Sequence, residues 1–268
     1  MTATFSAIPA EALRLTDLLD AVAERQRRDF GHMASEAKAD GSLITACDRW
    51  SDETLVQGLG QLYPGEGVLS EEGRKLVPSS SAYWVVDPLD GTTNFAAGIP
   101  YWAISMARFE GGVPVLAVLD VPPLRQRIIA VRGVGAWRNG KHLKPPGHEA
   151  QAAGCASLCS RSIGVLQKLP DRRFPGKIRL LGVASLNLVS VAMGQTVMAL
   201  EATPKIWDLA AAWLVLSELQ CPLRWLMRSP EQLVPGDDHG STDFPVLAAS
   251  SPEALERFMP WAEALLQG

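Results

Sequence analysis

Cysteine and histidine are scarce in this chain of 268 residues, with four of each. A zinc site usually needs two close pairs of such residues, and only Cys155 and Cys159 are near neighbours. We therefore expect buried or inert thiols. The scatter also argues against a cysteine–histidine nucleophilic pair, although distant residues can meet in a folded chain. The residues are Cys47, Cys155, Cys159, Cys221, His32, His142, His148 and His239.

Long apolar runs and excess positive charge are missing too. No stretch reaches 18 consecutive apolar residues, and residues 1–14 lack a basic segment followed by an apolar one. Neither a signal peptide nor a membrane span is expected, so a cytoplasmic location is predicted. The net charge of -4 and the lack of a dense basic face give no indication of a nucleic-acid partner. An acidic protein of this kind would have to recruit metal to bind phosphate.

The composition is that of a globular protein, with 47% hydrophobic and 20% charged residues. Helical spacing of leucines predicts a helix over 9–28 and another through Leu55, Leu59 and Leu62. Short alternating runs between residues 103 and 132, followed by Asn139-Gly140, predict antiparallel strands and a hairpin. The expected fold class is therefore α+β, with helices covering sheets.

Pro145-Pro146-Gly147-His148-Glu149 is the clearest break in the chain. It predicts a boundary between an N-terminal α+β subdomain, residues 1–147, and a C-terminal α/β subdomain, residues 148–268. No internal repeat accompanies it.

The most informative stretch is residues 84–105, where an apolar run ends in Asp87-Pro88-Leu89-Asp90-Gly91-Thr92-Thr93-Asn94. Proline places Asp87 in an extended conformation, so the strand is expected to stop at Asp87 and the chain to turn. Both aspartates can then face one point, which suits Mg²⁺ because it binds oxygen ligands. The residues after Gly91 are candidate helix caps, and free N–H groups there would offer an anion site. A polar turn satisfying its own backbone is the alternative.

Three further acids follow short apolar runs. Glu71 ends residues 67–70 and can reach Asp87 if the two strands are neighbours. Glu201 ends a strand, and Asp208 lies at the start of a buried helix. Each has a plain alternative, either a solvated acid or a cap, and Asp48 is open to the same helix-cap interpretation. The basic loop 172–179 is either a solvated loop or a site for a second anionic group of a substrate.

Together these motifs resemble the inositol monophosphatase family of Mg²⁺-dependent, lithium-sensitive phosphatases. The resemblance rests on Asp87 to Asn94, on Trp207-Asp208-Leu209-Ala210-Ala211 and on Ser70-Glu71-Glu72, and it covers roughly residues 10–250. Lys38-Ala39-Asp40-Gly41-Ser42 and the glycines near Asn139 match minor signatures. It implies a layered α-β-α-β-α sandwich and a homodimer.

The resemblance also implies roles for individual residues. Glu71, Asp87 and the Leu89 carbonyl would bind a first Mg²⁺, and Asp87, Asp90 and Asp208 a second, with a weaker third ion at Glu71. The nucleophile would be a metal-activated water that Glu71 and Thr92 orient and deprotonate. Phosphate would lie on the metals and on the N–H groups of Gly91 and Thr92. Four residues would face the alcohol part of the substrate, namely Asp90, Ala184, Glu201 and Asp208.

The function expected on this basis is hydrolysis of a small phosphate monoester, foremost inositol monophosphate. Relatives with the same motif act on histidinol phosphate, fructose 1,6-bisphosphate, phosphoadenosine phosphate or NADP, and these stay open. So does a non-catalytic protein that binds metal or ligand without turnover. Ser70 and Gln220-Cys221 stand where the family often has glycine, and the tail around residues 227–245 matches poorly.

Overall fold

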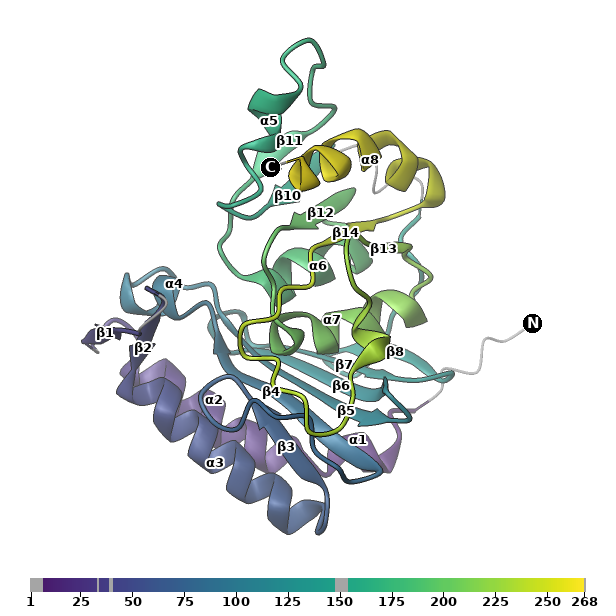
Figure 1. The fold of residues 1–268 in the computed structure, drawn as a ribbon. Coiled ribbons are helices and arrows are strands. Elements are labelled where there is room, and N and C mark those ends of the chain that lie inside the picture. Colours follow the sequence, from purple (N-terminus) through teal and green to yellow (C-terminus); the bar gives the residue numbers. More distant parts are fainter. Residues whose placement is uncertain (1–6, 33, 39–40, 148–153, 268) are drawn as a thin grey trace.

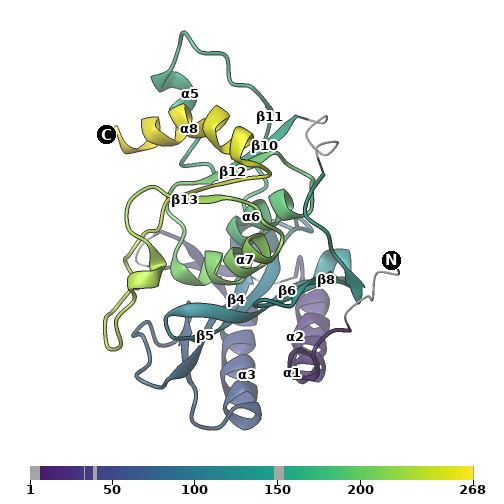
Figure 2. The same ribbon diagram turned by 90° about the vertical axis from the view of Figure 1, so that its right-hand side faces the viewer.

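The computed structural model describes residues 7–32, 34–38, 41–147 and 154–267. Two layers of strand separate three layers of helix, which confirms the expected α-β-α-β-α arrangement (Figures 1 and 2). The N-terminal helices pack under one face of a seven-stranded sheet, and α6 and α7 pack between this sheet and a five-stranded one. The helices α5 and α8 cover the outer face of the smaller sheet.

The first helical layer starts with a helix that is shorter than expected. The predicted helix over 9–28 is divided into α1 and α2, because the N–H of Arg14 bonds three residues back to the Glu11 carbonyl and closes the first turn. Leu19 and Val22 are buried on the inner face of α2. The elements are α1 (Ala10–Leu13), α2 (Thr16–Asp29), β1 (Ser35–Ala37), β2 (Leu43–Thr45) and α3 (Ala46–Leu62).

The seven-stranded sheet has the strand order β3-β4-β5-β6-β7-β8-β9. Only β3 and β4 pair in parallel, and the other neighbours are antiparallel, as the turns and the Asn139-Gly140 hairpin predicted. Its elements are β3 (Gly67–Ser70), β4 (Ala82–Asp90), α4 (Thr92–Ala96), β5 (Ala103–Glu110), β6 (Val113–Val121), η1 (Pro122–Leu124), β7 (Gln126–Val131), β8 (Gly135–Arg138) and β9 (Lys141–His142).

The second sheet has the order β11-β10-β12-β14-β13 and mixes parallel and antiparallel pairs. After α7 the chain turns at Gln220, whose φ of 56° lies in the left-handed region that glycine adopts most easily. The elements are β10 (Cys155–Leu158), α5 (Val165–Lys168), β11 (Lys177–Arg179), α6 (Ala184–Ala192), β12 (Met198–Glu201), α7 (Ile206–Glu218), β13 (Leu223–Trp225), η3 (Pro230–Gln232), β14 (Val246–Ala249) and α8 (Pro252–Leu266).

One expected boundary and one expected cap differ from the structure. Strand β4 does not stop at Asp87 but continues to Asp90, because Asp87 pairs with Ser105 and Asp90 with Ala103 on either side of an irregularity. Proline has no N–H to donate, and the irregularity accommodates it. The cap position of α4 is Gly91, with a φ of 104°, and no side chain of the following residues caps the helix.

The break at residues 145–149 runs partly outside the described residues, and so does the Lys38–Ser42 motif at Ala39 and Asp40. The subdomain boundary at 147/148 stays a proposal. The tail packs against the segment between β3 and β4, where Asp238 forms a bridge with Leu76 and the Val77 N–H donates to the Asp237 carbonyl over 3.0 Å.

A carboxylate cluster beside a buried cavity

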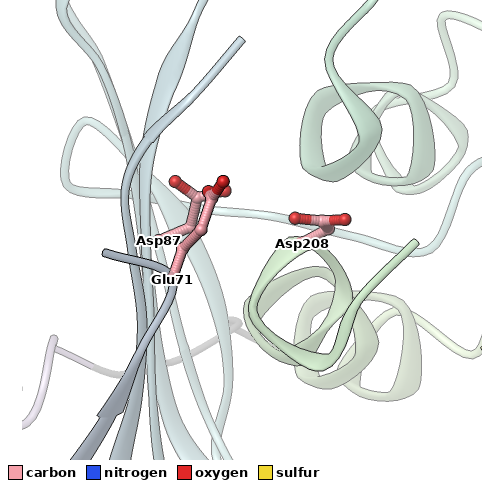
Figure 3. Close-up of side chains that lie close together, drawn as sticks. All are labelled: Glu71, Asp87 and Asp208. Atoms are coloured by element: carbon pink, nitrogen blue, oxygen red, sulfur yellow. The ribbon is translucent and has the colours of Figure 1, made fainter. Parts of the chain in front are cut away.

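Three carboxylates converge where the two halves of the chain meet. Oxygen atoms of Glu71, Asp87 and Asp208 all lie within 4.8 Å of one another. In Figure 3, Glu71 and Asp87 extend side by side from adjacent strands, Glu71 just after β3 and Asp87 within β4, and Asp208 extends from the facing start of α7. We call these three residues the acidic triad.

Local structure places each member of the triad. Strands β3 and β4 are parallel and Ser70 lies opposite Val86, so the next residues, Glu71 and Asp87, are neighbours at the same sheet edge. This confirms the expected pairing of the two strand ends. Asp208 occupies the third position of α7, where its Oδ2 accepts the Lys205 N–H over 2.7 Å. The predicted cap interpretation of Asp208 is thus also correct, and the same carboxylate belongs to the acidic triad.

Two members of the triad, Asp87 and Asp208, are destabilised in their charged forms when no cation is bound. Burial raises the pKa of Asp87 well above its usual range, and the charges of Glu71, Asp90 and Asp208 raise it further. Burial likewise raises the pKa of Asp208, followed by the charges of Asp90 and Glu71. Buried like charges of this kind require a cation to remain ionised together.

Lys38 supplies the cationic neighbour that the protein itself provides. Its Nζ donates to Glu71 Oε1 at 2.9 Å and to Glu72 Oε1 at 2.5 Å. Burial, reinforced by the charge of Glu71, nevertheless raises the pKa of Glu72 to about 7. The Lys38 ammonium therefore offsets only part of the negative charge of the acids. In the described structure it forms ion pairs with Glu71 and Glu72, and with neither Asp87 nor Asp208.

Asp90 and Gly91 form the next layer around the triad. Asp90 lies outside the three-acid group, and its Oδ2 accepts the Ser185 N–H at the start of α6 over 2.7 Å. Burial raises the pKa of Asp90 to about 6. Gly91 is tightly enclosed, because a Cβ there would lie 2.8 Å from the Val183 side chain. Its φ is also left-handed, which favours glycine at this position. The close approach brings the β4–α4 turn against α6.

Thr92 has a partner that the sequence did not reveal as functional. Its hydroxyl donates to Asp48 Oδ1 at 2.7 Å and lies 3.1 Å from the Leu89 carbonyl. Asp48 also completes the capping box of α3, because its Oδ2 accepts the Thr45 N–H at 2.8 Å. The predicted cap is correct, but one oxygen caps the helix while the other faces Thr92. The missing information was spatial, since 44 residues separate Asp48 from Thr92.

A cavity of about 200 Å³ opens next to the triad. Asp90, Ala184, Glu201 and Asp208, the four residues expected to face the substrate's alcohol, all line it. Gly91 and Thr92, at the start of α4, are not among its lining residues. The other lining residues were not predicted from the sequence. They are Cys159, Ser160, Arg161, Gly182, Val183, Asn187, Thr203 and Pro204.

The floor of this cavity carries polar groups with free bonding capacity. Glu201 is buried, and burial raises its pKa to about 8. Asn187 donates through Nδ2 to Glu201 Oε1 over 2.8 Å. The Oδ1 of Asn187 is buried and has no partner among the described residues.

Comparisons with known proteins agree with this geometry. The model of the inositol monophosphatase family matches residues 7–239. The chain belongs to the inositol monophosphatase family.

Its relatives differ in their named activities. A histidinol-phosphatase of Mycobacterium tuberculosis is 34% identical over 221 residues, covering 77% of this chain and 83% of the relative. An inositol-1-monophosphatase of Rhizobium meliloti is 33% identical over 204 residues, covering 71% and 76%. The solved Thermotoga maritima IMPase shares the fold, with a TM-score of 0.79, 24% identity and coverage of 94% and 96%. The chain is a phosphoric monoester hydrolase of this family, and the relatives' names leave its substrate open.

The acidic triad fits the family's metal. Its donors are carboxylate oxygens, with the Leu89 carbonyl nearby, and such oxygen-only sets suit hard divalent cations. The raised pKa values of Asp87 and Asp208 show that the uncompensated charges are costly here, which a divalent ion would correct.

Among the described helices, none combines the length and apolarity needed to cross a membrane.

We expect Mg²⁺ to stabilise the protein more at about pH 7.5 than at about pH 5. The folded chain raises the pKa of Asp90 from 3.8 to about 6, so between these values it holds a proton that the unfolded chain has lost. Metal-free stability therefore falls as pH rises through this window, whereas Mg²⁺ favours the deprotonated carboxylates. At a concentration about 100 times its Kd, one ion adds about 2.7 kcal/mol. Thermal unfolding in EDTA and in Mg²⁺, at both pH values, measures how far Mg²⁺ raises the Tm. An equal rise in Tm at the two pH values would contradict the prediction.

Proposed function

We propose that this chain hydrolyses a small polyol phosphate, with inositol monophosphate as the reference substrate, in a reaction that depends on Mg²⁺. The observation that carries the proposal is the juxtaposition of the acidic triad with a cavity whose floor consists of Asp90, Asn187 and Glu201. The triad suits cations that bind a phosphate, and the floor suits hydroxyl groups.

Each ligand has an assigned place in this proposal. Glu71, Asp87 and the Leu89 carbonyl would hold a first Mg²⁺, and Asp87, Asp90 and Asp208 a second. A third, weaker ion would share Glu71. When bound, Mg²⁺ supplies Lewis acidity, which lowers the pKa of water and stabilises negative charge on phosphate and leaving oxygen. The buried position of Asp87 and Asp208 makes this charge stabilisation stronger than it would be in water.

Thr92, Asp48 and Glu71 would handle the proton of the attacking water. The Thr92 hydroxyl already donates to Asp48 Oδ1, so its oxygen is oriented to accept a proton from water while its own proton passes to the Asp48 carboxylate, which becomes neutral. Glu71 would orient the same water. The water oxygen bonds to phosphorus, the ester P–O bond breaks, and the alcohol leaves with a proton. The N–H groups of Gly91 and Thr92 would contact the phosphate.

The cavity floor supports recognition of a hydroxylated alcohol. At neutral pH the raised pKa leaves Glu201 largely protonated, so it offers a donor as well as an acceptor. Asn187 Oδ1 has no partner among the described residues, and the small side chain of Ala184 lines the same cavity. Adjacent ring or chain hydroxyls would meet both requirements.

An amino-alcohol phosphate is the second candidate. Acidic lining and the free Asn187 acceptor also suit an ammonium group, and the Mycobacterium tuberculosis relative is a histidinol-phosphatase. Fructose 1,6-bisphosphate, phosphoadenosine phosphate and NADP complete the family alternatives. A binding protein without turnover is the alternative of another class.

Initial rates of phosphate release over this panel, with Mg²⁺ and with EDTA, test the proposal. We expect kcat/KM for inositol monophosphate to exceed that for phenyl phosphate, which lacks hydroxyls, by about tenfold or more, the effect of a few hydrogen bonds to buried groups. Preference for histidinol phosphate would favour the second candidate. Binding of Mg²⁺ and substrate without release of phosphate would support the non-catalytic alternative and contradict the proposal.

Family membership also supports three properties that we include in the proposal: inhibition by lithium, a homodimeric assembly and a cytoplasmic location. Inhibition of Mg²⁺-dependent turnover by LiCl but not by KCl would test the first property. Sedimentation of the purified protein would test the second.

A further inference from the structure

One cationic side chain reaches the cavity beside the triad. Arg161 is the only lysine or arginine among the residues that line it. Its Nη1 donates to Thr203 Oγ1 over 2.8 Å, and no carboxylate of the described residues lies within ion-pair distance of it. Arg161 and its neighbour Ser160 are exposed, so they stand at the open side of the cavity, while Glu201 is buried in its floor.

The position of Arg161 is fixed by its surroundings, although its side chain is exposed. The following residue, Ser162, is fully buried, and its hydroxyl donates to the carbonyls of Cys159 at 2.9 Å and Leu200 at 3.1 Å. These bonds hold the turn after β10 against β12. Thr203 lies on the loop between β12 and α7, and orients the guanidinium from the opposite side.

The charge around Arg161 is unusual for a surface arginine. Three acids, Asp90, Glu201 and Asp208, line the same cavity, yet the guanidinium bonds to a neutral hydroxyl instead. Guanidinium groups carry five N–H donors, and paired donors match a carboxylate or a phosphate. Most donors of Arg161 stay available to a ligand that enters from solvent.

We propose that Arg161 binds a second anionic group of the substrate, so that the chain prefers polyol phosphates that carry a further phosphate or carboxylate over those that do not. This inference rests on the proposed function and refines it. Hydroxyls near the scissile phosphate would contact Asn187 and Glu201 on the floor, and the anionic group would contact Arg161 at the opening. Thr203 is then a positioning residue, since it holds the guanidinium in place.

The basic loop 172–179, which the sequence offered for this task, lies elsewhere. None of its residues lines the cavity, and part of it forms β11 at the outer edge of the small sheet. Arg173 is an exposed arginine of this loop and provides a matched control for substitution.

The test compares matched pairs of substrates with the Mg²⁺-loaded full chain. Fructose 1,6-bisphosphate and fructose 1-phosphate differ by one phosphate, and 2-phosphoglycerate and glycerol 2-phosphate differ by one carboxylate. For each pair, the ratio of kcat/KM values measures the preference for the second anion. We expect Arg161→Gln to lower at least one ratio about tenfold or more, mainly through KM, because a charge-assisted bond is lost. The pair that responds identifies the anionic group.

Three controls make the outcome decisive. Arg173→Gln should leave both ratios unchanged, and Arg161→Lys should recover part of the lost preference because the charge remains. Unfolding curves check that the variants are folded. If Arg161→Gln slows both members of each pair equally, Arg161 contacts the scissile phosphate and the inference is wrong. Unchanged ratios also overturn it, while wild-type turnover still supports the proposed function. No Mg²⁺-dependent release from any ester by wild type overturns both.

Discussion

Replacement of Asp87 by asparagine should lower kcat for phosphate release by at least about a thousandfold, the scale on which one metal-bound charge acts in hydrolysis. Asp87 would belong to both Mg²⁺ sites, so its loss removes a ligand from each. Asparagine keeps the shape and can still accept the Leu89 N–H, which donates to Asp87 Oδ1 over 2.9 Å. The backbone at the end of β4 should therefore stay in place.

The same substitution should have an opposite effect on stability without metal. Asp87 is charged only at the expense of burial and of repulsion from Glu71, Asp90 and Asp208. The neutral amide relieves these costs, so the variant in EDTA should unfold at the same temperature as wild type or a higher one. Mg²⁺ should no longer stabilise it. Asp171→Asn, at an exposed position, is the matched control and should retain activity and the response to Mg²⁺. Turnover within tenfold of wild type in Asp87→Asn would contradict the assignment.

Replacement of Thr92 by valine should lower kcat by about 100-fold to 10,000-fold and leave KM nearly unchanged, the range seen when a group that handles a proton is removed. Valine fills the same volume but cannot donate to Asp48 Oδ1 or accept from water. Substrate binding through the metals and the cavity floor does not require that hydroxyl. The kinetics of phosphate release over a range of substrate concentrations separate kcat from KM.

Several variants distinguish this role from a structural one. Thr92→Ser keeps the hydroxyl and should recover most of the activity. Thr54→Val removes a hydroxyl that donates to the Trp50 carbonyl inside α3, and should leave kcat unchanged. Asp48→Asn should slow turnover, because the amide is a far weaker proton acceptor, whereas its oxygen can still accept the Thr45 N–H in the capping box of α3. A Thr92→Val enzyme with raised KM and normal kcat would show that Thr92 binds substrate instead.

The sequence predicted those parts of the site that depend on local rules. Apolar runs before Glu71 and Glu201 correctly predicted strand ends, and the buried helix start predicted the place of Asp208. The strand end expected at Asp87 was wrong, because β4 continues to Asp90. Parallel pairing of β3 with β4 then brings Glu71 beside Asp87, because Ser70 lies opposite Val86. Convergence of acids from three chain positions follows from the layered fold.

Other features depend on contacts between distant segments and could not be predicted. Asp48 reaches Thr92 only because β2, which leads into α3, packs against α4. From the sequence alone, its capping role was sufficient to explain Asp48. Arg161 follows a short strand, and no motif around it indicates a function. The arginines near residue 172, in contrast, belong to a run of basic residues that can be recognised from the sequence. Strand β4 continues past Pro88 since β5 pairs with both Asp87 and Asp90, which no local preference encodes.

Phosphate release by the EDTA-treated chain, measured before and after Mg²⁺ is restored, tests the central claim most directly. The substrate is the best one from the panel, and Asp208→Asn is assayed in parallel. We expect no phosphate release in EDTA and a saturable recovery of wild-type activity as Mg²⁺ is added. Asp208→Asn should show no comparable recovery. Full activity of the wild-type chain in EDTA, or equal recovery by Asp208→Asn, would contradict it.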